Sequence, residues 1–493
     1  MKNNLIFEML ATSAMKFKDK TAVTYKNETY SYTAMLDEIH MLSKHIHELT
    51  VTLDHPVGLL FKNCPEFIIG YYGLIKEDIV TMLIDHKLKG DELQALVNDC
   101  HLGGFLLHRD ELEHFALKDK FDCVLEYKNF ALLYKTDHQY NRPYNQAELM
   151  AVTSCRFSSG TTGGPKCMMY AEDNIIAAAT NWKNTIHLNE QDKILCLANY
   201  THGLAFNTSM LSPLSVGAEI HMLDSLMPRA IAKYIEQKRI TKLVAFPVLY
   251  QIMAEKNMKD AYDLASLRIC VSSGTVLHAE IKQKFKENIG IHIADLYGVA
   301  ETGLCILNNS NKTDSVGQPL AGVEIAIMDD HGNKLPIGGE GQIAIKSGSM
   351  AKGYYNVPGL FENRVTQEGF YLSGDIAVMD ENSFVFVKGR KQDFVDIAGK
   401  KVDPKEIEEV LLRIEGIDDV AVFGKKSTKT KLEVLCAAVV SRHGVSKEDI
   451  VEFIQPRLAA YKIPQRILFM EQLPRNTYGK VLRRVLIDSM SEI

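Results

Sequence analysis

The chain has no long apolar run. None of its hydrophobic stretches approaches the length of a membrane-spanning helix, and the N-terminal segment MKNNLIFEML lacks the apolar core and small-residue cleavage site of a signal peptide. The nine cysteines are dispersed, without a CxxC pair or the Cys/His spacing of a metal site. We therefore expect a cytoplasmic protein with reduced thiols and no membrane span.

An excess of positive charge is also missing. The 56 Lys and Arg residues against 62 Asp and Glu give a formal net charge of −6, and the cations are scattered rather than clustered on one element. A partnership with nucleic acid is therefore disfavoured. The composition, 46% hydrophobic and 24% charged, is typical of a soluble globular protein.

Most of the chain shows a layered α/β pattern. Amphipathic stretches such as YTAMLDEIHMLSKHI, residues 32–46, alternate with short apolar runs, which is typical of helices packed on a sheet. Buried, partly parallel strands are predicted at 192–198, 217–223, 241–247 and 266–274. A chain of 493 residues is too long for one hydrophobic core, so we expect two or more domains.

The pattern changes after residue 308. The segments GVEIAIMDD, GQIAIKS, YLSGDIAVMD and SFVFVKG predict a compact all-β subdomain. Beyond GRKQD the predicted order is helix, strand, strand, helix, with Asp403 and Pro404 starting the first helix and Ser446 capping the second. The predicted fold class is α/β: a large N-terminal body of α/β subdomains plus a small β subdomain, residues 1–389, and a mobile small α+β C-terminal domain, residues 390–493.

Residues 157–166, FSSGTTGGPK, combine glycines, hydroxyl side chains and a closing lysine. Glycines let backbone N–H groups approach a polyphosphate, hydroxyls donate further hydrogen bonds, and Lys166 supplies positive charge. The stretch is not a Walker loop, because Gly164 is followed by Pro165 rather than by lysine. By itself such a cluster also fits a flexible surface loop, so a second signal has to decide.

That second signal is a series of motifs in a fixed order. From Phe157 almost to the C-terminus the chain carries FSSGTTGGPK, LYGVAETG, SVGQPLAGVEIAIMD, GEGQIAIKSGSMAKGYYNVP, YLSGDIAVMD, KGRKQDFVDIAGKKVDPKEIEEV and LPRNTYGKVLRR. This series resembles the acyl-adenylate-forming superfamily of acyl- and aryl-CoA synthetases, peptide-synthetase adenylation domains and luciferases, and most of all a stand-alone bacterial acyl-CoA synthetase. The resemblance implies an enzyme that uses ATP, Mg²⁺ and CoA. A small-molecule carboxylic acid and ATP would give an acyl-adenylate and pyrophosphate, after which the acyl group passes to a thiol.

The resemblance also implies which residues bind the nucleotide. The β- and γ-phosphates of ATP would be held by Ser158, Ser159, Gly160, Thr161, Thr162 and Lys166. Tyr297, next to Gly298, would stack on adenine, and Glu301 would coordinate the magnesium ion, because a hard cation prefers carboxylate oxygen. The adenine and acyl pocket would be lined by a strand end at Ser273, Gly274 and Thr275.

Further residues are implied in ribose binding and catalysis. Asp375 would accept hydrogen bonds from both ribose hydroxyls, since a carboxylate offers two oxygens without a competing donor, and Arg390 would assist. Lys480 would contact ATP as the catalytic lysine and stabilise charge between the carboxylate and the α-phosphate. His202 in NYTHGLAF would gate the acyl site, and with Thr162 it completes the catalytic candidates.

Three positions depart from the family pattern. Ala300 replaces a threonine that contacts the α-phosphate, and Cys167 replaces a glycine. At the expected hinge between the domains stands Gln392, followed by Asp393. Ala300 and Gln392 keep open a non-catalytic nucleotide- or acyl-binding homologue, although the retained Lys480, Glu301 and hydroxyl-rich loop argue against it.

The acceptor thiol and the acid also stay open. Pro404 at a helix start is typical of CoA ligases and favours CoA; the alternative is an adenylation enzyme that loads the phosphopantetheine of a carrier protein. NYTHGLAFN lacks the aspartate with which amino-acid-activating relatives hold an ammonium group, and the segment carries no cation for a second carboxylate. A neutral acyl or aryl acid, as in fatty acid metabolism, is therefore favoured.

Overall fold

The structure is a computed structural model, and it describes residues 4–88, 91–112, 120–135, 137, 144–158, 166–274, 277, 279–310, 312, 314–391, 395–397, 400–426, 433–441, 444–475 and 481–490. The chain divides into two compact units. The first comprises Met1–Thr313, Gly317–Glu324 and Ile345–Tyr371, and the second Asp314–Val316, Ile325–Ala344 and Leu372–Ile493. The predicted α/β class with a large N-terminal and a small C-terminal part is confirmed. The domain boundary at residue 390 and the mobility of the C-terminal domain stay predictions.

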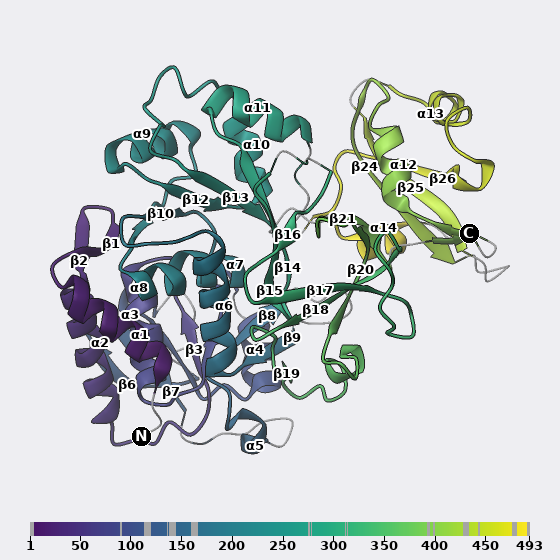
Figure 1. The fold of residues 1–493 in the computed structure, drawn as a ribbon. Helices are drawn as coiled ribbons and strands as arrows, with labels where there is room; N and C mark the ends of the chain where they lie inside the picture. Colours follow the sequence, from purple (N-terminus) through teal and green to yellow (C-terminus); the bar gives the residue numbers. More distant parts are fainter. Residues whose placement is uncertain are drawn as a thin grey trace. The chain divides into compact units, whose positions relative to one another are not determined.

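A nine-stranded sheet forms one half of the first unit (Figure 1). In spatial order its strands are β16 (Gln318–Pro319), β15 (Gly303–Asn308), β14 (Ile293–Val299), β13 (Ile269–Ser273), β12 (Lys242–Ala245), β10 (Lys193–Cys196), β11 (Glu219–Met222), β1 (Thr21–Tyr25) and β2 (Glu28–Ser31). The strands from β14 to β1 pair in parallel. Every residue of β12 and β13 is buried, as expected of parallel strands that are covered on both faces.

An eight-stranded sheet forms the other half of this unit. Its order is β19 (Gly353–Tyr354), β9 (Lys166–Tyr170), β8 (Ser154–Ser158), β4 (Thr81–Leu83), β3 (Val57–Leu60), β5 (Gly104–His108), β7 (Phe130–Tyr134) and β6 (Asp122–Tyr127). β3, β4, β5 and β8 pair in parallel, whereas β9 and β19 are added antiparallel at one edge. The motif-bearing strands β8 and β9 therefore lie next to one another near that edge.

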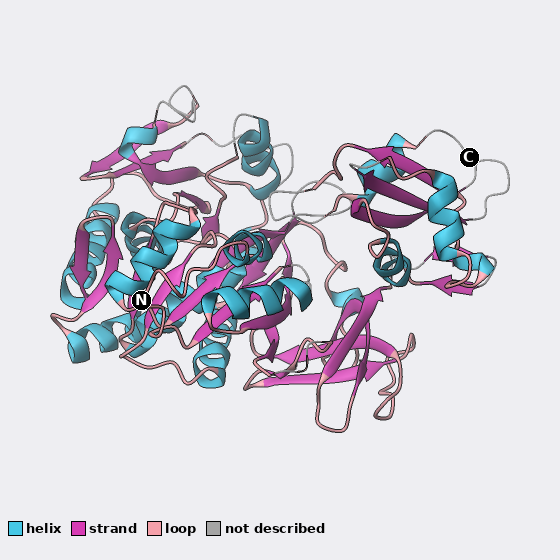
Figure 2. Cartoon of the chain, turned by 90° about the horizontal axis from the view of Figure 1, so that it is seen from above, coloured by secondary structure: helices cyan, strands magenta, loops and turns pink. Residues whose placement is uncertain are grey.

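Helices layer against both sheets, as Figure 2 shows with helices in cyan and strands in magenta. They are α1 (Leu5–Phe17), α2 (Tyr32–His47), α3 (Pro65–Lys76), α4 (Asp91–Cys100), α5 (Gln146–Leu149), α6 (Glu172–Thr185), α7 (Gly203–Phe206), α8 (Ser212–Val216), α9 (Pro228–Lys238), α10 (Pro247–Ala254) and α11 (Ala279–Ile289). In α2 the buried residues Tyr32, Met35, Ile39, Leu42 and Ile46 recur at helical spacing and form the face that packs inward. No helix in the described part of the chain is long and apolar enough to cross a membrane.

The second unit confirms the predicted change of pattern. A four-stranded sheet has the order β17 (Val323–Met328), β18 (Gly341–Ser347), β20 (Tyr371–Met379) and β21 (Val385–Arg390), and some of its strand ends belong to the first unit. A three-stranded sheet follows with β24 (Ile417–Lys426), β25 (Glu433–Ser441) and β26 (Arg466–Met470), beside the small hairpin β22 (Val395–Ile397) and β23 (Lys400–Val402). Its helices are α12 (Pro404–Leu411), α13 (Lys447–Ile454) and α14 (Arg483–Ser489).

Both predicted helix caps of the second unit are confirmed. The Asp403 carboxylate accepts from the backbone N–H of Lys405 at 2.9 Å and begins α12. The Ser446 hydroxyl accepts from the N–H of Asp449 at 3.1 Å, and the Asp449 carboxylate accepts from the N–H of Ser446 at 2.8 Å. This reciprocal pair satisfies otherwise unpaired donors at the start of α13.

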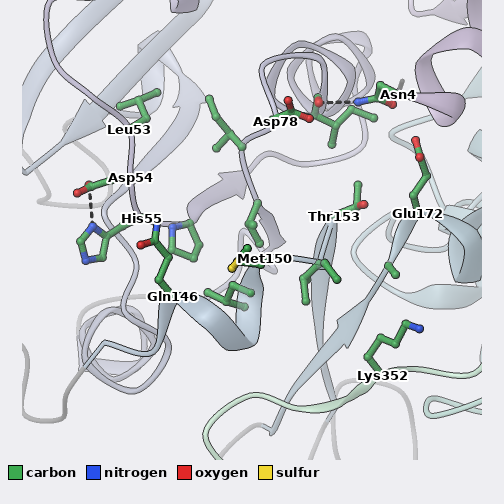
Figure 3. A pocket seen from close by; sticks show the side chains of 18 of the residues that line it. Asn4, Leu53, Asp54, His55, Asp78, Gln146, Met150, Thr153, Glu172 and Lys352 are labelled. Carbon is green, nitrogen blue, oxygen red and sulfur yellow. Dashed lines mark hydrogen bonds and ion pairs between the residues drawn. The ribbon is translucent and has the colours of Figure 1, made fainter. Parts of the chain in front are cut away.

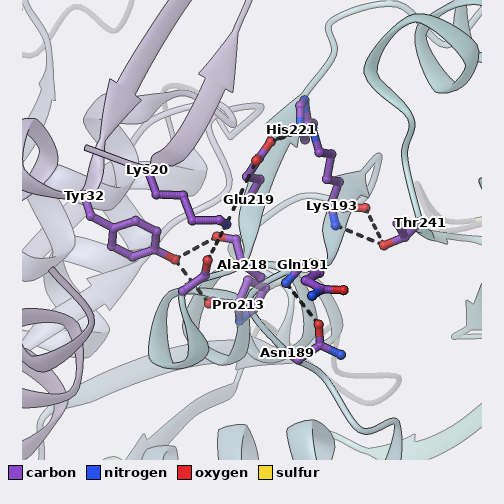
Figure 4. A network of polar contacts seen from close by, with 11 residues as sticks. Lys20, Tyr32, Asn189, Gln191, Lys193, Pro213, Ala218, Glu219, His221 and Thr241 are labelled. Atoms are coloured by element: carbon purple, nitrogen blue, oxygen red, sulfur yellow. Dashed lines mark hydrogen bonds and ion pairs between the residues drawn. The ribbon is translucent and has the colours of Figure 1, made fainter. Parts of the chain in front are cut away.

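A polar network fastens β1, β10 and β11 at one end of the nine-stranded sheet (Figure 4). The Glu219 carboxylate lies 3.1 Å from the Lys193 ammonium and 3.4 Å from Nε2 of His221. Lys20 approaches Glu219 to 4.0 Å and donates to the Gly217 carbonyl at 2.6 Å. Although burial opposes ionisation, the hydrogen bonds from His221 and Lys193 and the charges of Lys193 and Lys20 lower the pKa of Glu219 to about 2. Glu219 therefore stays ionised and holds three chain segments together.

Replacing this carboxylate tests how much the network stabilises the unit. Glu219→Gln leaves Lys193 and Lys20 without their shared counter-charge, so we expect a loss of about 1–3 kcal/mol in the free energy of unfolding at pH 7. Chemical denaturation of the two proteins measures the difference. Lys193→Met alone and the double variant complete a double-mutant cycle, and additive effects would contradict a direct interaction between the two side chains.

Candidate active site

Two paired strands flank the hydroxyl- and glycine-rich stretch. β8 and β9 pair antiparallel, with Ser158 opposite Lys166. Lys166 opens β9, and its ammonium lies 5.8 Å from the centre of the Tyr354 ring. Six of the predicted site positions lie outside the described residues, namely Ser159, Gly160, Thr161, Thr162, Thr275 and Lys480, as do the side chain of Ser158 and the hinge residues Gln392 and Asp393.

The predicted adenine-binding residues sit on neighbouring parallel strands. Ser273 ends β13 and pairs with Leu296 of β14, which places it beside Tyr297. Gly274 follows with φ +101°, a conformation that favours glycine. Gly298 lies where β14 and β15 approach so closely that a Cβ would meet the carbonyl oxygen of Gly303 at 2.3 Å. The structure thus brings both motifs to the carboxyl edge of one sheet, where such sheets bind ligands.

The turn that carries Glu301 is held at three successive carbonyl groups. The Tyr170 hydroxyl donates to the Ala300 carbonyl at 2.6 Å, and the Ala351 N–H donates to the Glu301 carbonyl at 2.7 Å. The Ser349 hydroxyl donates to the carbonyl of Thr302 at 2.7 Å. Because Tyr170 belongs to β9 and the other donors come from the segment before β19, the turn is tied to the sheet that bears the loop.

A tyrosine that the sequence did not single out orients the Glu301 carboxylate. Tyr354 of β19 donates a short hydrogen bond to Oε1 of Glu301 while its ring faces Lys166. Burial and, after it, the Glu301 charge raise the pKa of both Tyr354 and Tyr371, so both phenols remain protonated donors at neutral pH. The motif GYYNVP contains Tyr354, but only the pairing of β19 with β9 shows which residue it meets.

Glu301 suits a magnesium ion whose remaining ligands come from phosphate and water. The described residues contain no group of three or more His, Cys, Asp or Glu side chains that could hold a metal ion. Mg²⁺ bound with a nucleotide needs only one or two protein carboxylates together with phosphate oxygens. A single oriented carboxylate near a lysine therefore fits a metal–nucleotide complex and does not fit a metal site built from protein ligands alone.

His202 caps α7 in its neutral form. Its Nδ1 accepts from the backbone N–H of Leu204 at 3.2 Å, and its ring meets the ring of Phe246 edge-on with centroids 5.2 Å apart. A Cβ on Gly274 would lie 3.2 Å from the same Phe246 ring, so this phenylalanine joins the histidine to the end of β13. Burial and the charge of Arg156 lower the pKa of His202 to about 4.

Arg156 is the second residue that the sequence reading missed. It lies in the middle of β8 and is only 4% exposed, with its guanidinium 4.0 Å from the centre of the Tyr170 ring. A Cβ on Gly203 would lie 2.8 Å from its Nη1. The signal that could have found it is an arginine in the middle of the short segment SCRFS, directly before the glycine-rich stretch. A charged side chain is rarely buried in a strand without a partner or a function.

The predicted ribose-binding residues lie in the second unit. Asp375 of β20 pairs with Arg390 of β21 in the strand register, and the two side chains form an ion pair with Oδ1 of Asp375 2.9 Å from Nε of Arg390. The Asp375 side chain is 8% exposed and that of Arg390 45%. The two residues meet as the sequence implied, and their part in binding ribose stays a prediction.

A cavity of about 650 Å³ lies elsewhere in the first unit (Figure 3). It includes the acidic side chains of Asp54, Asp78, Glu172 and Asp173 and the cation Lys352. None of the residues predicted to bind ATP or the acid is among its described lining residues. Its acidic lining opposes a polyphosphate, so the candidate active site is the region around Lys166, Tyr297 and Glu301 instead.

The lowered pKa of His202 predicts how the stability of the first unit depends on pH. Between pH 6.5 and about 4 the unfolded chain binds a proton at His202 that the folded chain excludes, so the stability of the first unit should fall as the pH falls through this window. His202→Asn keeps an oxygen that can cap α7 but cannot titrate.

We expect the melting temperature of the variant to fall less steeply than that of the wild type between pH 6.5 and 4. Thermal melts in buffers spanning this range measure the difference between the two proteins. Parallel curves would show that His202 is protonated in the folded state as readily as in the unfolded state.

Comparison with known proteins agrees with this geometry. Residues 10–355 match the family model of the AMP-binding enzyme, and residues 406–480 match that of the AMP-binding enzyme C-terminal domain. The chain is 26% identical over 537 residues to a long-chain-fatty-acid–CoA ligase of Bacillus subtilis (strain 168), covering 99% of this chain and 95% of that one. It is 32% identical over 349 residues to a medium-chain fatty-acid–CoA ligase of Escherichia coli (strain K12), covering 69% and 61%.

The fold is shared with a solved structure as well. An ATP-bound crystal structure of MatB from Rhodopseudomonas palustris superposes with a TM-score of 0.83 at 21% identity, covering 98% of each chain. At this identity the match shows a shared fold alone, and it covers residues of both units.

Proposed function

The chain belongs to the AMP-binding enzyme family, and from this membership we propose that it is an ATP-dependent acid–thiol ligase with CoA as acceptor. The carboxylate of the acid attacks the α-phosphate of ATP, and pyrophosphate leaves with the electrons of the broken phosphoanhydride bond. The thiolate of CoA then attacks the acyl carbonyl, and AMP leaves. The net products are an acyl-CoA, AMP and pyrophosphate.

The observation that carries this proposal is the fixed turn at Glu301. Lys166 and Glu301 come from two motifs far apart in the sequence, and Tyr297 stands in the same motif as Glu301. Tyr354 faces the first two, and the turn bonds tie the Glu301 segment to β9. A cation and a carboxylate that share one tyrosine suit the phosphates of a nucleotide and their counter-ion. A bound magnesium ion would neutralise phosphate charge at Glu301.

The chain's own residues bind the nucleotide and stabilise the charge that develops during adenylation. Tyr297 offers an aromatic face to adenine, and Lys166 with the hydroxyls of its loop binds the outer phosphates. Asp375 and Arg390 hold the ribose, and Lys480 stabilises the charge that moves between the carboxylate and the α-phosphate. We place the domain boundary at residue 390 and the hinge at Gln392, so that the C-terminal domain reorients between the two steps.

Exchange of labelled pyrophosphate into ATP, measured across a panel of acids, tests the proposal. Acid-dependent exchange supports adenylation, and AMP release that rises on adding CoA identifies the acceptor. Release that rises only with a phosphopantetheinylated carrier protein would replace CoA by that partner. A protein that exchanges with none of the acids and binds ATP would be a non-catalytic homologue.

Tyr354→Phe tests how Glu301 is held. The variant removes the hydroxyl that donates to the carboxylate and keeps the ring, so we expect the apparent affinity for magnesium–ATP to fall by ~10-fold, as for other groups that orient a metal ligand. Calorimetric titration with ATP at several Mg²⁺ concentrations measures it.

The neighbouring tyrosine provides the control for this variant. The hydroxyl of Tyr355 lies 2.8 Å from Nδ1 of His101, away from Glu301, so Tyr355→Phe should leave the Mg²⁺ dependence unchanged. Equal behaviour of the two variants would contradict an orienting role for Tyr354.

Lys480→Ala tests the catalytic lysine. Loss of one preorganised charge that acts in the transition state should slow adenylation by ~10²–10³-fold. Thioester formation from a synthetic acyl-adenylate should be nearly unaffected, because the chemistry at phosphorus is then complete. A wild-type rate of pyrophosphate exchange, or an equal loss in both half-reactions of a folded variant, would exclude this role.

A further inference from the structure

The guanidinium of Arg156 is a buried charge without an acidic partner. The residue is 4% exposed, its Nε is buried without a hydrogen bond, and the described residues provide no carboxylate that forms an ion pair with it. Burying an unpaired charge is expensive, and a protein normally offsets it with an ion pair or a full set of hydrogen bonds. The chain retains this charge in the middle of a strand, which indicates that a partner arrives from outside.

Aromatic rings support the charge but do not satisfy its donors. The guanidinium carbon lies 4.0 Å from the ring centre of Tyr170 and 5.1 Å from that of Phe206. A ring attracts the flat face of a guanidinium, whereas the N–H groups point outward in its plane. The N–H groups at the edge of the Arg156 guanidinium are therefore left for a hydrogen-bond acceptor.

Other polar groups near this edge also lack partners. The hydroxyl of Ser154, which shares a face of β8 with Arg156, is buried without a hydrogen bond, and so is the hydroxyl of Tyr71. Burial raises the pKa of Tyr71, and the Ser154 hydroxyl and then the Arg156 charge oppose this shift, so the three side chains lie close together. Both polar atoms of the Asn207 amide are buried and unpaired too. Such groups are uncommon in protein interiors and call for a ligand or water.

Asn207 belongs to the helical segment that follows His202, so the unpaired polar groups lie on this segment as well as on β8. It lies one helical turn beyond Gly203, so both residues share a face of the helix. Nη1 of Arg156 lies 2.8 Å from the position of a Cβ on Gly203. At residue 207 α7 also passes into a π-helix, Asn207–Leu211, a distortion that is frequent at functional sites.

We propose that Arg156 and Asn207 bind a second carboxylate of the substrate, so that the enzyme activates a dicarboxylic acid. The inference rests on the proposed function and specifies its substrate class. A planar guanidinium matches a carboxylate through paired N–H···O bonds, and the Asn207 amide can donate a further one. It differs from the expectation of a neutral acid, which rested on the lack of a cation in the segment around His202 itself. The cation comes from β8 instead.

Matched acids test the proposal. Monocarboxylic and dicarboxylic acids of equal chain length are compared by pyrophosphate exchange and by their affinity for the protein with ATP. We expect kcat/KM of the wild type to favour the best dicarboxylic acid at least tenfold over its monocarboxylic counterpart. Arg156→Met should remove this preference, lowering kcat/KM for the dicarboxylic acid by ~10²-fold and leaving that for the monocarboxylic acid within a few fold.

Two further variants keep the test decisive if Arg156→Met is unstable. Asn207→Leu should lower the same preference from the helix side, and Arg239→Met, which removes an exposed arginine paired with Asp263, should leave it unchanged. Exchange with monocarboxylic acids but not with dicarboxylic acids would overturn the inference and leave the proposed ligase function standing. Exchange with no acid at all would overturn both.

Discussion

The candidate site depends on the hydrogen bonds that hold residues 300–302. Each of the three carbonyl groups in this turn accepts a bond from a different donor, and two of the donors, Tyr170 and Ala351, lie on or beside strands of the eight-stranded sheet. The turn itself joins β14 to β15 in the nine-stranded sheet. These bonds therefore hold the turn that bears the Glu301 carboxylate against β9, the strand that begins with Lys166. A nucleotide that contacts both meets a preorganised site.

Local sequence patterns predicted what local physics decides. The caps at Asp403 and Ser446 and the buried parallel strands lie where the pattern placed them, because capping and hydrophobic periodicity act over a few residues. The same local patterns do not predict which strand pairs with which. β1 near the N-terminus pairs with β11, whose register places Val23 opposite Ile220, and nothing in either short segment encodes that choice. Such pairings depend on the packing of the complete unit.

The same distinction separates the site residues that were predicted from those that were missed. Lys166 closes a stretch whose composition suggests phosphate binding, whereas Glu301 and Tyr297 stand in a motif that is significant through its resemblance to the family. Tyr354 and Arg156 are ordinary residues in short strands, and their importance comes from what β19 and β8 place beside them. A residue that acts by meeting a distant segment becomes visible only when the chain is folded.

The departures from the family pattern look less damaging in the structure than in the sequence. At residue 300 it is the backbone carbonyl that fastens the turn, through Tyr170, and alanine supplies that group as well as threonine does. The side chain of Cys167 is buried in an apolar cluster with Cys100 and Cys155, so this replacement fills the core under β9. Hydrogen bonding with these two thiols, then burial, raises the pKa of the Cys167 thiol, which disfavours a reactive thiolate. Both replacements therefore leave the backbone around the site held in place, and the group that Ala300 lacks is the threonine hydroxyl of the family pattern.

Of the two basic side chains beside α7, Arg156 is charged and His202 is neutral. Arg156 is permanently charged, and its proximity and the burial of His202 keep the histidine neutral above pH about 4. A neutral His202 can cap α7 through Nδ1, which a doubly protonated ring could not do. If the histidine were charged, two positive groups would repel each other beside the same glycine, and the helix start would lose its acceptor. Burial and, after it, the charge of Arg156 thus keep the residue predicted to gate the acyl site neutral, and the buried Nε of Arg156 itself makes no hydrogen bond within the described part of the chain.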